Sequence, residues 1–373
     1  MLAEGLELPT RCLQNSRSTT ELSQQKHSFD SCECVNLKKG LLLVNPLFFA
    51  YSVSLPIRFK IGSKFKPDPL VNEMEANFRA GFVALVGRPN VGKSTLLNSL
   101  LGQKISITAD KPQTTRNQIR GILTEDRFQA ILVDTPGIHL PKNELHKRIV
   151  GYAHKSISES DLVFYLCEPL LLHQDPSNGD KAIVERLAGL EKKAYLLLNK
   201  IDLYSPAEVM RSLEVYNQLF PFAETFAISA QTKRGLEGLT ELLAKALPVS
   251  PPLFELDQVT DLPEKVLCGE FIREQIHRRL HQEVPFGVAV VVDKFQEEGV
   301  RVKIWATVFV ERESHKKILI GKAGEMLKTI GTGARRRIET LVGSKVFLDL
   351  HVKVAQGWVD NRSRLAEFGY KEE

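Results

Sequence analysis

The sequence predicts an α/β fold with a mostly parallel sheet over residues 78–248, followed by a smaller α+β domain over residues 258–373. In the first part, nearly continuous apolar segments of strand length alternate with helical segments, which is typical of parallel strands buried on both faces. In the second part, a long strand alternates between apolar and polar residues, so we expect only one of its faces to be buried. The proline-rich segment 248-PVSPP-252 marks the boundary, and we expect a linker at 249–257.

The elements of the first part follow from this alternation. Residues 103–120 are polar and show no clear period, which predicts a loop. A glycine at the end of 95-TLLNSLLG-102 closes the first helix. We expect strands at 82–87, 128–134, 161–168, 194–200 and 225–230, and helices at 95–102, 142–159, 178–190, 206–220 and 235–247.

The second part is predicted to begin with a helix and to contain three main strands. A shorter apolar segment, 315-HKKILIG-321, is expected to be a further strand that leads into a glycine-flanked loop and a helix. The predicted helices are 264–282 and 321–341, and the main strands are 286–295, 300–313 and 346–354.

Composition leaves the function open. A chain of 373 residues is long enough for two hydrophobic cores, and its net charge of +5 permits an anionic partner without requiring one. The five cysteines are odd in number and scattered, which favours a reducing compartment over disulfides or a zinc site: Cys12, Cys32, Cys34, Cys167 and Cys268.

Residues 1–73 differ from the rest of the chain. The apolar run 41–57 is interrupted by Asn45, Pro46 and Pro56, so it is poorly suited to cross a membrane. The acidic residues in this stretch argue against an ordinary transit peptide. We expect Met74 to be the true start, with a degenerate targeting segment, and hence an organelle location, as the alternative.

A phosphate-binding loop is predicted at 87-GRPNVGKS-94, between a strand and a helix. Its backbone N–H groups and the helix N-terminus would face the phosphates of a nucleoside triphosphate. Lys93 would reach the β- and γ-phosphates, and Ser94 would bind Mg²⁺. The loop residues assigned to the nucleotide are Gly87, Arg88, Pro89, Asn90, Val91, Gly92, Lys93 and Ser94.

The segment 199-NKID-202 at a strand end predicts guanine as the base. The Asp202 carboxylate can accept hydrogen bonds from the N1–H and the amino group of guanine, whereas adenine would leave it unpaired. We expect Asn199 to face the other edge of the purine and the stem of Lys200 to pack on the ring. Ile201 and, from 228-ISA-230, Ser229 and Ala230 complete this part of the site.

The segment 134-DTPG-137 is predicted to lie near the metal and the γ-phosphate. Asp134 would act in the second coordination shell of Mg²⁺, and the Gly137 N–H would sense the γ-phosphate. Of the two threonines in 113-QTTRN-117, we favour Thr115 over Thr114 as the metal ligand. Ile138 stands where many GTPases have a glutamine, so we assign no general base and expect Lys93, Thr115 and Gly137 to support the transition state. Thr135, Pro136 and Ile138 are also assigned to the nucleotide site.

Residues 78–373 together resemble the Era family of translation-factor-like P-loop GTPases. The resemblance rests on GRPNVGKSTLLNSLLGQKISITADKPQTTRNQIRGI, DTPGIH, NKID and ISA, followed by a second domain with GKAG. It implies a P-loop G domain that hydrolyses GTP to GDP, with an apolar residue after DTPG as a family feature. Because Ile138 cannot orient a water, we expect a slow intrinsic rate. Some related GTPases hold K⁺ through a P-loop asparagine, and Asn90 occupies that position.

The loop 321-GKAG-324 resembles the GxxG loop of a type II KH domain, which clamps about four nucleotides. GxxG alone is a weak signal, but seven basic residues and one acidic residue lie between positions 314 and 337, whereas a solvated helix face would mix both signs. The RNA-binding candidates are Lys316, Lys317, Gly321, Lys322, Ala323, Gly324, Lys328, Arg335 and Arg336.

The Era resemblance also implies the partner and the setting. It implies 16S-type ribosomal RNA near its 3′ end, a role in maturation of the small ribosomal subunit, a cytoplasmic location, and peripheral association with the membrane. We expect a monomer. Two other functions remain open: a GTP-binding RNA interaction protein with negligible hydrolysis, and a P-loop kinase, which the guanine-specific motifs disfavour.

Overall fold

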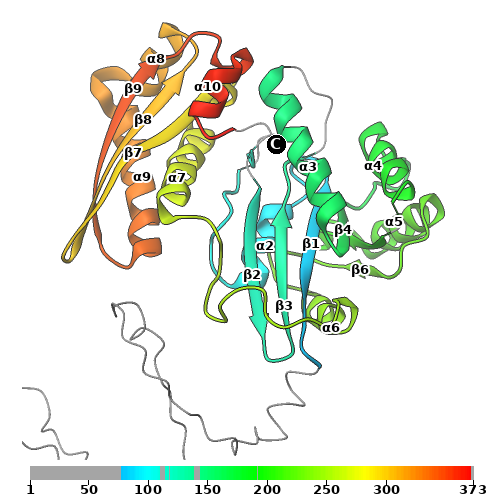
Figure 1. Cartoon of the computed structure of the whole chain (residues 1–373). Helices are drawn as coiled ribbons and strands as arrows, with labels where there is room; N and C mark the ends of the chain where they lie inside the picture. Colours follow the sequence, from blue (N-terminus) through cyan, green and yellow to red (C-terminus); the bar gives the residue numbers. More distant parts are fainter. Residues whose placement is uncertain (1–76, 110–113, 117, 138–142, 191, 371–373) are drawn as a thin grey trace, which may run out of the picture. The chain divides into compact units, whose positions relative to one another are not determined.

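The computed structural model describes residues 77–109, 114–116, 118–137, 143–190 and 192–370 (Figure 1). The first domain contains a six-stranded sheet in the order β2-β3-β1-β4-β5-β6, in which β2 is antiparallel to β3 and the other pairs are parallel. This arrangement confirms the predicted α/β class. The strands are β1 (Arg79–Gly87), β2 (Ile119–Glu125), β3 (Phe128–Asp134), β4 (Leu162–Cys167), β5 (Lys193–Leu198) and β6 (Thr225–Ala227).

Helices cover both faces of this sheet because successive side chains of a buried strand point to opposite sides. Val83 and Leu85 of β1 pack in one core with Leu96, whereas Ala84 and Val86 pack in the other core with Ile157. The first core contains residues of α2 and α6, and the second contains residues of α3, α4 and α5. These helices are α2 (Lys93–Leu101), α3 (Glu144–Glu159), α4 (Asn178–Ala188), α5 (Pro206–Leu219) and α6 (Glu237–Ala246).

The N-termini of several helices carry strong local signals. Ser177 forms a capping box with Asp180 at the start of α4, and Ser205 forms one with Glu208 at the start of α5. Asn143 accepts a hydrogen bond from the His146 N–H and caps α3. These caps explain why the predicted helices and the observed ones begin within a few residues of each other.

The strand β2 was not expected, because the sequence before β3 lacks an apolar period. It pairs with β3 from Ile119↔Asp134 to Glu125↔Phe128, so the pair forms a β-hairpin at the edge of the sheet. The predicted loop therefore ends at residue 118 and not at 120. The buried residues of β2, Ile119 and Gly121 to Leu123, do not alternate with exposed ones, and Arg120, Thr124 and Glu125 make the segment polar, so no strand period is visible.

The chain connecting the two domains is hydrogen-bonded to the first sheet. The Ala80 N–H donates to the carbonyl of Pro248 (3.1 Å), and the Ile122 N–H donates to the carbonyl of Val259 (2.8 Å). Between these points, the buried Gln129 side chain accepts from the Leu253 and Phe254 N–H groups at 2.7 and 2.9 Å. The predicted linker is thus fixed along the sheet and is not a free tether.

The second domain has a three-stranded sheet in the order β7-β8-β9, with β7 antiparallel and β9 parallel to β8 (Figure 1). The even-numbered residues of β8, from Val302 to Val310, are buried in one core with residues of α7 and α9, as the alternation predicted. The elements are α7 (Glu264–Arg279), β7 (Val288–Glu298), β8 (Arg301–Val310), α8 (Glu313–Ile320), α9 (Glu325–Val342), β9 (Lys345–Val354) and α10 (Arg362–Glu367). No helix in the described ranges is long and apolar enough to cross a membrane.

The predicted strand at 315–321 is wrong, because Glu313–Ile320 forms the helix α8. His315 and Leu319 are buried, and Lys317 and Ile318 are exposed, so the buried positions are spaced four residues apart. This spacing matches a helix face and not a strand. The GKAG loop consequently joins two helices, α8 and α9.

Candidate nucleotide and nucleic-acid sites

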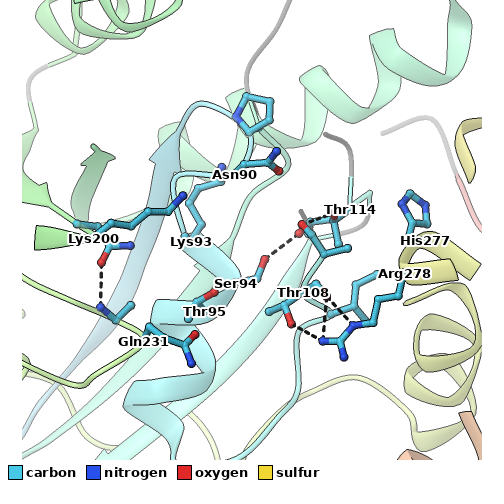
Figure 2. A pocket seen from close by; sticks show the side chains of 18 of the residues that line it. Asn90, Lys93, Ser94, Thr95, Thr108, Thr114, Lys200, Gln231, His277 and Arg278 are labelled. Carbon is cyan, nitrogen blue, oxygen red and sulfur yellow. Dashed lines mark hydrogen bonds between the residues drawn. The ribbon is translucent and has the colours of Figure 1, made fainter. Parts of the chain in front are cut away.

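A cavity of about 1030 Å³ opens where the predicted nucleotide motifs meet. Figure 2 shows Lys200 at one end of this cavity and His277 and Arg278 at the other. The predicted residues that line it are Pro89, Asn90, Gly92, Lys93, Ser94, Thr115, Gly137, Asn199, Lys200, Asp202, Ser229 and Ala230. Its size fits a nucleotide, because small-molecule sites are typically about 300–1,000 Å³.

The phosphate-binding loop depends on left-handed backbone at two positions. Asn90 has a φ of 66° and Gly92 a φ of 101°. A Cβ on Gly92 would lie 2.2 Å from the Nδ2 of Asn199, so glycine is required both for the turn and for the close approach. Gly92 is also the N-cap residue of α2, which directs the N–H groups of the first helical turn toward the cavity.

Lys93 is buried beneath this loop. Its ammonium donates to the carbonyls of Gly87 (3.0 Å) and Arg88 (2.9 Å). Burial lowers the pKa of Lys93 to about 8, and the nearby Asp134 partly offsets this effect. A bound anionic phosphate would favour the charged form and raise this pKa.

Four oxygen-bearing side chains converge beside Lys93. The Ser94 hydroxyl donates to Oδ2 of Asp134 (2.6 Å) and lies 3.0 Å from the Thr115 hydroxyl, which itself lies 3.3 Å from Oδ2. Ser106, which the sequence did not suggest, also donates to Oδ2 (2.7 Å). Burial raises the pKa of Asp134, while Lys93 and these hydrogen bonds oppose that rise.

These residues fit Mg²⁺. Oxygen donors are what Mg²⁺ prefers, and the buried Oδ1 of Asp134 has no hydrogen-bond partner among the described residues. Thr114, the other candidate, donates its hydroxyl to the Ala109 carbonyl at 3.3 Å. The Thr115 hydroxyl is therefore the one that lies with Ser94 and Asp134.

At the base end, the Asn199 amide links two loops of the site. Its Nδ2 donates to the Val91 carbonyl (2.8 Å), and its Oδ1 accepts from the Ala230 N–H (2.9 Å). The buried amide thus joins the phosphate loop to the 228–230 loop. Asn199 also lines the cavity and its Nδ2 has a second hydrogen, so its contact with the purine stays a prediction. Asp202 is exposed and lines the cavity, and Lys200 forms an ion pair with Glu168.

Two residues assigned to the nucleotide direct their side chains elsewhere. The Arg88 Nε donates to the buried Asp180 at 3.0 Å, so this side chain connects the phosphate loop to α4. The Thr135 hydroxyl donates to the Leu85 carbonyl at 2.6 Å, inside the sheet. Of the remaining assigned residues, Gly87, Val91, Asp134, Pro136 and Ile201 are not among those that line the cavity, and Ile138 lies outside the described residues.

The segment after β3 approaches the phosphate loop closely. A Cβ on Gly137 would lie 2.7 Å from the Pro89 nitrogen, so only glycine fits there without displacing the loop. This contact places the Gly137 backbone at the wall of the cavity, where its N–H was expected.

The second domain contributes part of the cavity wall. His277, Arg278 and His281, at the end of α7, line the cavity, and the Arg278 guanidinium donates to the Thr108 carbonyl at 3.3 Å. Sequence reasoning missed them because no local pattern links residues about 170 positions apart. The other lining residues that it missed are Thr95, Ile107, Thr108, Ala109, Leu203 and Gln231. Thr95 follows the phosphate-loop motif directly and could have been included.

The GKAG loop has the backbone conformation expected of a loop that a nucleic-acid backbone can approach closely. Gly321, Ala323 and Gly324 all have positive φ, at 74°, 51° and 79°. A Cβ on Gly321 would lie 2.7 Å from the Met326 Cβ, whereas one on Gly324 would meet nothing within 4 Å. The tip therefore has open space at Gly324, where a ligand backbone can approach.

The predicted basic residues lie around this loop on α8 and α9. Most of these side chains are exposed, and Lys316 is half-buried: Lys317, Lys322, Lys328, Arg335 and Arg336 are the exposed ones. Ile330 is fully buried in the domain core, and Met326 and Leu327 pack against that core. These apolar residues therefore support the helix and do not form an open floor for bases.

Comparison with known proteins agrees with this two-part organisation. Residues 82–200 match the family of 50S ribosome-binding GTPases, and residues 283–359 match the KH domain. The chain is 48% identical to GTPase Era of Geotalea uraniireducens over 299 residues, which are 80% of this chain and 99% of that protein. It is 47% identical to GTPase Era of Geobacter sp. strain M21, over 80% of this chain and 99% of that protein.

Solved structures give the same result. An Aquifex aeolicus Era variant bound to GDP and AlF₄⁻ superposes with a TM-score of 0.76 at 34% identity, covering 79% of this chain and all of that one. An Era in complex with MgGDPNP and nucleotides 1506–1542 of 16S ribosomal RNA superposes with a TM-score of 0.75 at 35% identity, with the same coverage. The predicted resemblance is thus confirmed, and the chain belongs to the Era family of GTPases.

Proposed function

We propose that this GTPase is a switch protein that binds small-subunit ribosomal RNA near its 3′ end and assists assembly of the small ribosomal subunit. Support comes from family membership and from the 35%-identical Era that is bound to nucleotides of 16S ribosomal RNA. The positive-φ GKAG loop, with its exposed lysines and arginines, provides a surface of suitable shape and charge.

The observation that carries the nucleotide assignment is that one cavity contains both the oxygen cluster and the base-reading carboxylate. Ser94 and Thr115 lie at the phosphate end, and Asp202 lines the same cavity. We assign Ser94 and Thr115 as ligands of Mg²⁺, with Asp134 behind them. Bound there, Mg²⁺ would supply positive charge to the phosphate oxygens.

The chemistry proposed for GTP hydrolysis is mainly positioning and charge stabilisation. Lys93 would neutralise charge that develops on the β- and γ-phosphates, and the Gly137 N–H would orient the γ-phosphate. No side chain is assigned as a general base. The slow intrinsic rate that we expect is a consequence, because the attacking water is left without a side chain dedicated to orienting it.

We further propose that Asn90 holds K⁺ beside the triphosphate. Asn90 lines the cavity and has a left-handed backbone conformation, with a φ of 66°. Hydrolysis should then be faster in K⁺ than in Na⁺ buffer, and Asn90→Ala should abolish the difference. Equal rates in both buffers for the unchanged protein would exclude this role.

Single-turnover hydrolysis with and without a 16S ribosomal RNA fragment tests the proposed function. We expect slow hydrolysis alone and a change in rate when the RNA, or the small subunit, is added. Normal hydrolysis with no RNA binding would overturn the RNA assignment. RNA binding without hydrolysis in either condition would instead favour a protein that uses GTP only for structure.

The domain limits and the location stay proposals. We place the GTP-binding domain at 78–248, the linker at 249–257 and the KH-type domain at 258–373. A monomeric cytoplasmic protein, peripherally associated with the membrane, is proposed, with an organelle as the alternative if residues 1–73 form a targeting segment. N-terminal sequencing of the natural protein and fractionation of the cell test the start at Met74 and the location.

A further inference from the structure

The metal-binding candidate Thr115 is flanked by two contacts with the KH-type domain. On one side, the Thr114 carbonyl accepts a hydrogen bond from the Arg273 guanidinium of α7. On the other side, the Arg116 side chain extends into the segment that precedes and begins β7. The backbone of residues 114–116 is thus held by a domain that contributes no ligand to the proposed metal site.

Arg116 makes the more extensive of the two contacts. Its guanidinium is fully buried and donates to the carbonyls of Val288 (2.6 Å), Phe286 (2.8 Å) and Pro285 (3.2 Å), and it lies 3.4 Å from the Tyr370 hydroxyl. The guanidinium is planar and holds five N–H donors in a fixed arrangement, so in one orientation it can bond to several carbonyls at once. Burial lowers the pKa of Arg116, so the cluster of carbonyl oxygens is what makes this buried charge tolerable.

Arg273 is also fixed in place. Its side chain is 1% exposed and forms an ion pair with Glu270, one turn earlier on α7. This pair orients the guanidinium toward the Thr114 carbonyl, since one Nη atom serves both partners.

Helix α7 also contacts residues 104–108, at the beginning of the predicted loop. The buried Glu274 carboxylate accepts from the Thr108 N–H at 3.2 Å and forms ion pairs with Lys104 and Arg278. Ile107 lies in the hydrophobic core of the second domain. Described residues on both sides of 110–113 are therefore attached to α7.

We propose that Arg116 and Arg273 are positioning residues for GTP hydrolysis, which hold Thr115 where its hydroxyl meets Ser94 and Asp134. This inference rests on the proposed metal role of Thr115. It assigns to the RNA-binding domain a part in stabilising the triphosphate state. GDP lacks the γ-phosphate that orders such loops, so its binding should depend little on either arginine.

Arg116→Lys in the full chain tests the proposal by affinity for a non-hydrolysable GTP analogue and for GDP, both with Mg²⁺. We expect analogue affinity to fall roughly tenfold, as for loss of a buried charge-assisted hydrogen bond, and GDP affinity to change less than about twofold. The Mg²⁺ concentration that gives half-maximal analogue binding should rise. If Arg116→Lys does not fold, Arg273→Lys, which should shift the same ratio, carries the test.

A double-mutant cycle separates positioning from general support of the fold. In the Thr115→Ala background, Arg116→Lys should cost less than about twofold, because the hydroxyl it positions is gone. Equal costs in both backgrounds, or a parallel loss of GDP affinity, would overturn the proposal. Arg211→Lys is the matched control: the Arg211 guanidinium of α5 donates to the carbonyls of Leu171 (3.0 Å) and Gln174 (2.9 Å), outside the contacts of residues 114–116, and an equal shift in this variant would also overturn the proposal.

The Thr115→Ala variant by itself distinguishes failure of the proposed metal role of Thr115 from failure of the positioning role of the two arginines. If it leaves the analogue-to-GDP ratio unchanged, the metal role of Thr115 fails and the positioning role fails with it. If Thr115→Ala lowers the ratio and neither arginine variant does, only the positioning role is overturned.

Discussion

Arg88 of the phosphate loop and Asp180 of α4 form an ion pair in which the carboxylate is completely buried. Asp180 also accepts hydrogen bonds from the Tyr165 hydroxyl (2.8 Å) and from the Ser177 hydroxyl that caps α4 (2.7 Å). One carboxylate thus connects the phosphate loop, a central strand and a helix N-terminus. The conformation of the phosphate loop is therefore stabilised by the contact between Arg88 and Asp180 as well as by its own glycines.

Asp180→Ala should remove this support. Loss of a buried carboxylate that leaves its partners unpaired is expected to lower the free energy of unfolding by about 3 kcal/mol, measured by urea denaturation. The matched control is Glu241→Ala, which breaks the exposed pair with Arg127 and should cost less than about 1 kcal/mol. Equal costs for the two variants would contradict the importance given to burial.

Gly92→Ala should abolish nucleotide binding, because the new Cβ would overlap the Asn199 amide and the φ of 101° disfavours any side chain. Gly102→Ala is the control: its φ is also positive, at 68°, but nothing lies within 4 Å of the added Cβ. That variant should lose about 1 kcal/mol of stability and still bind GDP. Fluorescence titration with a labelled nucleotide checks both.

Nucleotide binding should become coupled to proton uptake near the lowered pKa of Lys93, about 8. Phosphate binding favours the ammonium, so affinity is highest below this pH and falls as pH rises above it. Calorimetry in two buffers of different ionisation enthalpy should show proton uptake on GDP binding at pH 8.5 and much less at pH 7.5.

The lowered pKa of Lys93 also affects the stability of the unliganded protein, but this effect grows as pH rises, whereas nucleotide affinity falls. Between about 8 and the ordinary value of 10.5, the unfolded chain binds more protons at Lys93 than the unliganded folded chain does. This residue therefore makes the unliganded protein more stable as pH rises through that window. Absence of proton uptake at pH 8.5 would contradict the lowered pKa.

Asp202→Asn should shift the base preference from GTP toward xanthosine triphosphate. The amide of asparagine complements the additional carbonyl of xanthine, whereas it no longer accepts from the guanine amino group. Competition binding with both nucleotides measures the change. An unchanged preference for GTP would remove Asp202 from the base-reading role.

Lys322→Glu combined with Gly324→Asp should weaken binding of the 16S ribosomal RNA fragment, roughly tenfold or more, by placing two negative charges at the tip of the GKAG loop. GTP affinity should stay within about twofold, since the loop lies in the other domain. Gly321 is left unchanged because a side chain there would collide with Met326. Lys353→Glu, an exposed change in β9, is the control for altered charge; loss of GTP binding in the double variant would indicate misfolding.

The nucleotide site was predictable because its motifs are local and each follows a strand. Ser94, Asp134 and Asp202 are recognised by neighbours a few positions away, and the sheet then brings the motifs together. The Arg88 side chain could not be placed in this way, because its partner Asp180 is 92 positions later. The long-range contacts of Arg116, and hence the contribution of α7 to the cavity, left no local signal either.

The prediction of secondary structure was wrong where the apolar residues of a segment are compatible with both a strand and a helix. The segment 315–321 has enough apolar residues for a strand, and only the burial of His315 and Leu319 against neighbouring elements distinguishes it as a helix. The strand β2 had the reverse difficulty, since its polar residues concealed a partly buried edge strand. In both cases tertiary packing, and not local preference, decided the element.

The connection between the domains has a consequence for solubility. β2 is the outermost strand of its sheet, and the segment at Val259 and Thr260 pairs with its outer side, at Ile122 and Gly121. An uncovered edge strand offers unpaired backbone groups to other chains and promotes aggregation. Besides joining the domains, the connector covers the outer edge of β2 and so protects the GTPase domain from self-association through this strand. A GTPase domain cut before residue 259 would lack this protection.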